Sequence, residues 1–170
     1  PWLTLRDVQT SIGKLLQGQD NPESVKNYDE LRIRFGDQAR FVMGELLAIA
    51  EDYEGTSVGN LANFYLGCIA VEEGNFEEAS EYMTQFDDDL VILSARSLAL
   101  AGDAYMELGE TEKAIEYYKR ASDNKPTESL TPNYLIKLAG AQESLEDYAG
   151  AVLSYEEIVK EYPKSKKIND

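Results

Sequence analysis

Apolar residues recur along the middle of the chain at the spacing expected of helices that bury one face. One such stripe comprises Leu61, Phe64, Tyr65, Cys68 and Ile69, and another comprises Ala114, Ile115, Tyr118 and Ala121. Steps of three and four residues bring side chains to the same side of a helix. The pattern therefore predicts a chain made of helices, without strands.

These helices come in pairs, and the pairs repeat. Segments that begin at Asn60, Ala95 and Pro132 align with one another at three kinds of position. A small residue in the first helix lets the second helix approach closely: Gly67, Gly102 and Ala139. A second position lies in the turn between the helices: Gly74, Gly109 and Glu146. A third begins the buried face of the second helix: Ala79, Ala114 and Ala151.

The period of these positions is close to the ~34 residues of one helix-turn-helix unit. In this respect the chain resembles the tetratricopeptide repeat family, over roughly residues 60–165. The resemblance implies an all-α fold, a right-handed α-solenoid of helix-turn-helix units. We expect three clear repeats, at about 60–93, 95–128 and 132–165, in an array that spans residues 60–170.

The residues before the array are predicted to be helical as well. Residues 1–59 should hold an amphipathic helix over 5–17 and one degenerate repeat, with helices over 22–35 and 38–53. We expect these helices and the array to form one continuous domain.

A narrower resemblance rests on three short runs: Gly55-Thr56 leading to Gly59-Asn60-Leu61-Ala62, then Gly102-Asp103, then Pro132 through Lys137. In these the chain is similar to tetratricopeptide proteins of Bacteroidetes-type bacteria, related to the ancillary subunit of the Sec translocon. That likeness implies a bacterial cell-envelope protein on the periplasmic side of the inner membrane. Contact with the membrane would then come only from an anchor upstream of Pro1. A cytoplasmic location is the alternative.

Charge narrows the range of partners. The chain has 32 acidic and 16 basic residues and a formal net charge of −16. Such a field repels nucleic acid and anionic lipid and favours basic or neutral partners. Solvated helix faces rich in Glu and Asp would produce the same composition.

The residue types used in most catalytic and metal sites are scarce. There is no histidine, and the single cysteine, Cys68, lies on an apolar stripe where a buried thiol is expected. No glycine-rich nucleotide-binding pattern occurs. The run from Asp87 to Asp89 lacks the ligand spacing of a calcium loop and suits a helix cap in a solvated loop. We therefore predict no catalytic, cofactor-binding or metal-binding residues, and no enzymatic activity.

The first helix of each repeat is expected to line a concave groove. Its predicted protein-binding residues are Leu61, Phe64, Val71, Glu72, Asp103, Met106, Glu107, Ile136 and Glu143. Apolar patches within acidic surroundings suit a basic or amphipathic segment. The alternative is that the helix over 5–17 already fills this groove.

Some tetratricopeptide domains hold an acidic C-terminus in a clamp of basic and amide side chains. The corresponding positions here are Phe64, Cys68, Leu100, Asn133 and Lys137. Only the last two suit an anion, so we expect no clamp.

The expected function is a protein-protein interaction scaffold that assists a membrane or secretion-related complex. A self-associating structural protein without a dedicated peptide ligand is the alternative, and homo-oligomers are left open.

Overall fold

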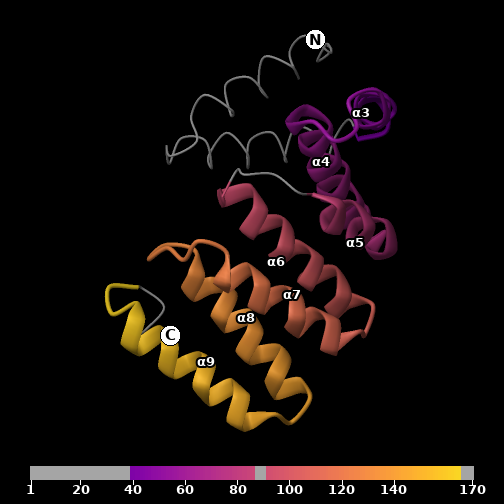
Figure 1. Cartoon of the computed structure of the whole chain (residues 1–170). Coiled ribbons are helices and arrows are strands. Elements are labelled where there is room, and N and C mark those ends of the chain that lie inside the picture. The colour runs from indigo at the N-terminus through magenta and orange to yellow at the C-terminus, as the bar shows by residue number, and fades with distance from the viewer. Residues whose placement is uncertain (1–38, 87–90, 166–170) are drawn as a thin grey trace. The chain divides into compact units, whose positions relative to one another are not determined.

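The computed structural model describes residues 39–86 and 91–165 (Figure 1). The described residues form seven helices and no strand, which confirms the all-α prediction. Two predicted helices, over 5–17 and 22–35, and the run from Asp87 to Asp89 lie outside these ranges. The chain divides into two compact units, Pro1–Leu90 and Val91–Asp170.

Three helices are described in the first unit: α3 (Ala39–Asp52), α4 (Ser57–Glu73) and α5 (Phe76–Gln85). Helix α4 packs against both α3 and α5. The pair α4 and α5 corresponds to the first expected repeat. Because α3 also packs on α4, it lies in the same compact unit as the first repeat.

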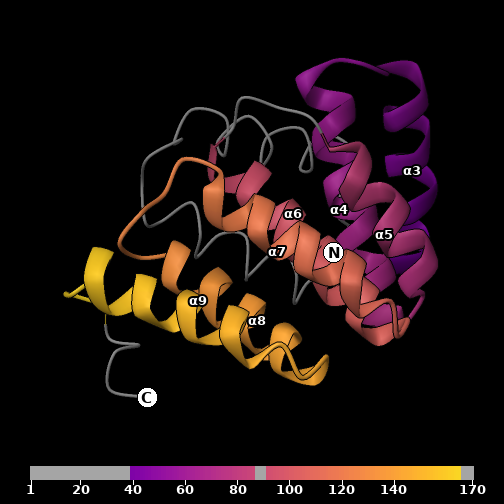
Figure 2. The same ribbon diagram turned by 60° about the horizontal axis from the view of Figure 1, so that its bottom comes forward.

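The second unit holds α6 (Val91–Glu107), α7 (Thr111–Asp123), α8 (Thr131–Ser144) and α9 (Tyr148–Glu161). Each of these helices packs against the next, and Figure 2 shows α8 and α9 lying alongside each other. Its main core joins three helices: Ala114 and Tyr118 of α7, Leu135 and Leu138 of α8, and Ile158 of α9. The pairs α6–α7 and α8–α9 are the second and third expected repeats.

The turn between the two helices of a repeat has the same hydrogen bonds in all three repeats. In the first, the Gly74 N–H donates to the Val71 carbonyl at 3.1 Å, and the Asn75 N–H donates to the Ala70 carbonyl at 2.8 Å. This is the Schellman arrangement, which satisfies carbonyls left open at a helix end. The same two bonds recur from Gly109 and Glu110 and from Glu146 and Asp147.

The arrangement requires a left-handed backbone at one residue of each turn. Gly74 and Gly109 supply it at φ of 77° and 74°, as only glycine does without steric cost. In the third turn Glu146 adopts φ of 60°. The glutamate therefore carries a strain that the glycines of the other two turns do not.

The small residues expected at close helix contacts lie at such contacts. A Cβ atom built on Gly67 would lie 2.8 Å from Cε of Met83, on the partner helix α5. One built on Gly102 would lie 2.5 Å from a ring carbon of Tyr118, on α7. The expected alanines of the second helices, Ala79, Ala114 and Ala151, are buried. The predicted register of the repeats is thus confirmed.

The turns generate a first prediction. Replacing Glu146 by glycine should raise the free energy of unfolding by about 0.5–1 kcal/mol, because the strain of a left-handed side chain exceeds the extra freedom of an unfolded glycine. Gly109→Ala should lower it by about 1 kcal/mol. Urea denaturation followed by circular dichroism measures both. A lower midpoint for Glu146→Gly would contradict the role given to this turn.

The helix contacts generate a second prediction, which ranks three glycine-to-alanine changes. Gly140 lies exposed in α8 with nothing near its missing Cβ, so Gly140→Ala should stabilise by about 1 kcal/mol through helix propensity alone. Gly67→Ala should be nearly neutral, because the tip of Met83 can move. Gly102→Ala should destabilise by about 1–3 kcal/mol, because the rigid ring of Tyr118 cannot yield. The same denaturation assay tests the order, and equal midpoints for Gly140→Ala and Gly102→Ala would refute it.

Candidate protein-binding surface

The nine residues predicted to line the groove fall into both compact units. In the first unit, Leu61 and Phe64 of α4 are buried, with 1% and 0% of their surface exposed. The ring of Phe64 lies 5.6 Å from that of Phe86 and 6.0 Å from that of Tyr65. Leu61 and Phe64 therefore belong to the core, and the prediction that they contact a partner is wrong for both.

The physical reason lies in the composition of α4. Between residues 61 and 70 every side chain except Asn63 is buried, so the helix has no broad exposed face along this stretch. A helix that is apolar all round is enclosed on every side. Val71 is half-buried and Glu72 exposed near the end of α4, and their binding role stays a prediction.

In the second unit the predicted residues lie on the first helices of two repeats. Asp103, Met106 and Glu107 are on α6, and Ile136 and Glu143 are on α8. Met106 and Ile136 are half-buried and pack against the same core cluster. Glu107 and Glu143 are exposed. We call these four residues, Met106, Glu107, Ile136 and Glu143, the α6–α8 surface.

Asp103 is held in a network that joins three helices. The Tyr118 hydroxyl of α7 donates a hydrogen bond to Oδ1 of Asp103 at 2.7 Å. The Lys137 ammonium of α8 donates to both carboxylate oxygens, at 2.5 and 2.6 Å, and lies 5.8 Å from the centre of the Tyr118 ring. The charge of Asp103 is therefore paired within the second unit, and its role in attracting a basic partner stays a prediction, as do those of Glu107 and Glu143.

The same network affects Tyr118 and Lys137. Burial raises the pKa of the Tyr118 hydroxyl far above its usual value, and the negative charge of Asp103 and the hydrogen bond to it raise it further. The hydroxyl thus remains a donor throughout the physiological range. Lys137, a position considered for an anion clamp, has its ammonium on Asp103.

Sequence patterns did not reveal the partners in this network. Tyr118 was assigned only to an apolar stripe, and its hydroxyl partner lies on the other helix of the repeat. Lys137 and Asp103 are 34 residues apart, close to one repeat period, so their pairing links neighbouring repeats. The sequence signal that could have revealed this pairing is the presence of opposite charges, Asp103 and Lys137, on the first helices of neighbouring repeats.

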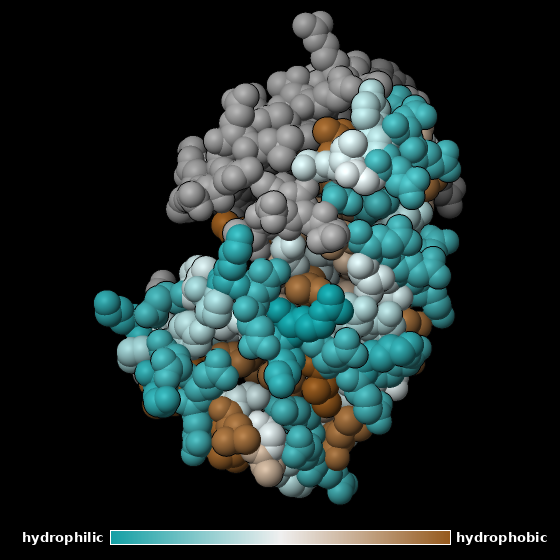
Figure 3. All heavy atoms as spheres, in the orientation of Figure 1, coloured by the Kyte–Doolittle hydropathy of each residue, from teal (hydrophilic) through white to brown (hydrophobic). Residues whose placement is uncertain are grey.

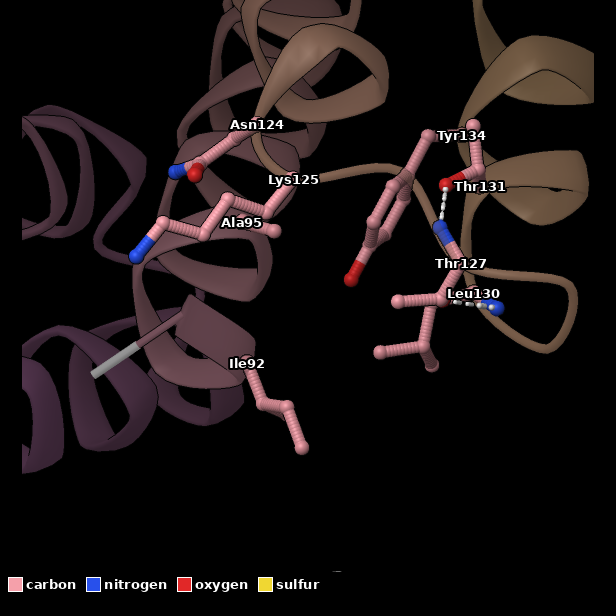
Figure 4. Close-up of a pocket in the computed structure, with 8 residues that line it drawn as sticks. All are labelled: Ile92, Ala95, Asn124, Lys125, Thr127, Leu130, Thr131 and Tyr134. Atoms are coloured by element: carbon pink, nitrogen blue, oxygen red, sulfur yellow. Dashed lines mark hydrogen bonds between the residues drawn. The ribbon is translucent and has the colours of Figure 1, made fainter. Parts of the chain in front are cut away.

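A small pocket lies at the end of the second unit where the loop between α7 and α8 meets α6 (Figure 4). Its cavity volume is about 10 Å³, roughly the space that one water molecule needs. The Thr127 N–H of this loop donates to Oγ1 of Thr131, the first residue of α8, at 2.8 Å. The pocket is a packing feature of this loop and adds no ligand site to the α6–α8 surface.

Over residues 39–86 and 91–165 the single cysteine, Cys68, is buried, as predicted for a thiol on an apolar helix face. Within these ranges no three Cys, Asp or Glu side chains gather as metal ligands would. None of the helices in these ranges has the length and apolar character needed to cross a membrane.

Comparison with known families agrees with the helix pairs. The tetratricopeptide repeat model matches residues 64–129 and again residues 100–166, which together cover more than half of the chain. The chain therefore belongs to the tetratricopeptide repeat family, whose repeats generally mediate binding between proteins. No curated protein was found to match the chain.

The network generates a third prediction, on the coupling between its members. A double-mutant cycle of Tyr118→Phe with Asp103→Ala should give a coupling of about 1–2 kcal/mol, because the Tyr118 hydroxyl is shielded and its acceptor is charged. The cycle of Lys137→Met with Asp103→Ala should give about 0–1 kcal/mol, since both groups are partly exposed. Only the lysine coupling should fall as salt is added. Urea denaturation supplies the free energies, and no coupling between Tyr118 and Asp103 would contradict the network.

Proposed function

We propose that this protein is a non-enzymatic scaffold that binds a segment of another protein on the α6–α8 surface. The observation that carries the proposal is the position of Met106 and Ile136. Both side chains rest on the core of the second unit while keeping part of their surface in solvent. Anchored apolar side chains of this kind supply most of the affinity in protein interfaces.

The charges around these anchors define the partner. Glu107 and Glu143 are exposed, and the net charge of the chain is −16. They would raise the rate of association with a basic segment and disfavour acidic ones. We therefore expect a basic or amphipathic peptide segment as ligand, and no nucleic acid.

The Tyr118–Asp103–Lys137 network prepares the surface for binding. It fixes α8 against α6 and α7 through Lys137, the residue next to Ile136. A surface held by such contacts loses little conformational freedom when a ligand binds. The network thus contributes rigidity, while the apolar anchors and acidic residues contribute contact and steering.

The cellular setting of the proposal rests on resemblance. The short runs shared with tetratricopeptide proteins related to the Sec translocon support a bacterial envelope location, on the periplasmic side of the inner membrane. In that setting the scaffold would assist a membrane or secretion-related complex through an anchor upstream of Pro1. A cytoplasmic scaffold with the same α6–α8 surface is the alternative.

A fourth prediction tests the surface in cells. A photoreactive amino acid placed at Met106 or Ile136 of the full-length protein should crosslink to a distinct partner. The same probe at Lys119, which is exposed on α7, serves as the matched control and should not give that adduct. Adding Glu107→Lys and Glu143→Lys should reduce the adduct, because charge reversal slows encounter with a basic segment.

Two readouts separate the parts of the proposal. The adduct should fractionate with the cell envelope if the proposed location holds, and with soluble protein if the cytoplasmic alternative holds. Equal crosslinking from Met106, Ile136 and Lys119, or none from any, would count against the α6–α8 surface in either compartment.

A further inference from the structure

Gly140 lies inside helix α8, at a position where the packing of the helix does not require a glycine. It is exposed, its backbone is not left-handed, and among the described residues nothing lies within 4 Å of its missing Cβ. At Gly67 and Gly102, by contrast, a Cβ would meet Met83 or Tyr118. A glycine inside a helix is less stable than an alanine there. Departures from local preference of this kind concentrate at functional sites.

The neighbours of Gly140 along α8 belong to the proposed binding surface. Ile136 precedes it by four residues and Glu143 follows it by three, so the three residues share one face of the helix. Ile136 is half-buried and Glu143 is exposed. Gly140 therefore lies on the α6–α8 surface, between an apolar side chain and a carboxylate.

The ion pair of Lys137 with Asp103 shows which part of α6 lies beside Gly140. The chain reverses between α6 and α7 and again between α7 and α8, so α6 and α8 run in the same direction (Figure 1). One turn beyond Asp103, α6 carries Met106 and Glu107, just as α8 carries Gly140 one turn beyond Lys137. Apolar and acidic side chains thus lie at the level of Gly140 on both helices. Figure 3 shows hydrophobic side chains among hydrophilic ones at the surface of the second unit.

The charges on α6 and α8 leave this part of the surface negative. The two helices carry five charged side chains: Arg96, Asp103, Glu107, Lys137 and Glu143. Asp103 and Lys137 neutralise each other, and Arg96 lies toward the amino end of α6. Glu107 and Glu143 remain, at the carboxyl ends of the two helices, where the helix dipole also favours a cation.

The turns that follow these helices do not cancel the negative charge. In the turn after α6, Glu110 pairs with Lys113 of α7. In the turn after α8, Glu146 and Asp147 are both acidic. The surface around Gly140 therefore attracts cationic groups and repels anionic ones.

The carboxylate of Glu143 is held in place by helix α9. The Tyr155 hydroxyl donates a hydrogen bond to it. Partial burial raises the pKa of that hydroxyl above its usual value, and the negative charge of Glu143 and the hydrogen bond raise it further. The hydroxyl thus stays a donor at physiological pH, and Glu143 keeps both its position and its charge.

We infer that Gly140 is a specificity-determining residue of the α6–α8 surface, which admits the side chain of a lysine or arginine of the partner. The inference rests on the proposed function and names the side chain that the surface selects. The aliphatic stem lies against the bare backbone at Gly140, beside Ile136, and the charged end reaches Glu143. Lysine and arginine combine these two features, an apolar stem and a cationic end.

The missing Cβ makes this arrangement selective. A side chain at residue 140 would occupy the position of the stem and hold it away from the helix. An acidic side chain of the partner would be repelled by Glu143, and an apolar one would desolvate Glu143 without pairing its charge. The stability that α8 loses at Gly140 is thus exchanged for contact with one class of side chain.

The fifth prediction uses peptides as probes of this position. Short random peptides displayed on phage are selected on the full chain, and those that also bind a folded Met106→Ala, Ile136→Ala variant are discarded. The remaining peptides should be rich in lysine and arginine. Gly140→Ala should weaken their binding by about five- to tenfold and Gly140→Leu by at least about fiftyfold, because each takes space from the stem. Fluorescence anisotropy of the labelled peptides measures both.

Stability separates this role from a structural one. Gly140→Ala should raise the midpoint of urea denaturation while it weakens peptide binding. Gly44→Ala is the matched control, because Gly44 is exposed in α3 with no described residue near its missing Cβ. It should raise the midpoint as well, and it should leave the affinity for the peptides unchanged.

A change in the peptide tests the contact with Glu143. Each basic residue of a selected peptide is replaced in turn by norleucine, which keeps an apolar stem and removes the charge. At one position this should weaken binding by about tenfold, and Glu143→Gln should then add no further loss.

The outcomes distinguish the inference from the function on which it rests. Full affinity in Gly140→Ala, or no peptide position coupled to Glu143, would overturn the inference and leave the α6–α8 surface in place. If no selected peptide depends on Met106 and Ile136, the proposed function fails, and the inference fails with it.

Discussion

The structure depends on how closely the two helices of each repeat approach one another. At Gly67 and Gly102 the first helix carries no side chain, and the second helix brings Met83 or Tyr118 into the space. A larger residue at either position would hold the helices apart or displace these side chains. Only at this separation can side chains interdigitate at the packing density of a protein core.

The close approach at Gly102 also positions the candidate binding surface. The ring of Tyr118 lies against Gly102, which allows its hydroxyl to reach Asp103, the next residue along α6. Asp103 in turn holds Lys137 of the following repeat. A packing constraint inside one repeat thus becomes an electrostatic link between two repeats. The link fixes the helix that carries Ile136, an apolar residue of the proposed surface.

Features confined to one repeat could be predicted from the sequence, and features that depend on several helices could not. The turns at Gly74, Gly109 and Glu146 and the contacts at Gly67 and Gly102 recur with the period, so alignment alone located them. The burial of Phe64 was left open, because a position on a first helix does not reveal whether further side chains cover it. The pairing of Asp103 was missed because its partners come from two other helices.

Helix α9, the last described helix of the second unit, shows what a repeat pattern leaves open. Tyr118 and Tyr155 occupy equivalent positions, yet one is covered by the next helix and the other is 38% exposed. Helix α8 packs on α7 and buries Tyr118, whereas Tyr155 lies on a helix of the same kind with part of its ring in solvent. Equal positions in the repeat therefore do not give equal burial, because burial depends on the helix that packs from outside the repeat.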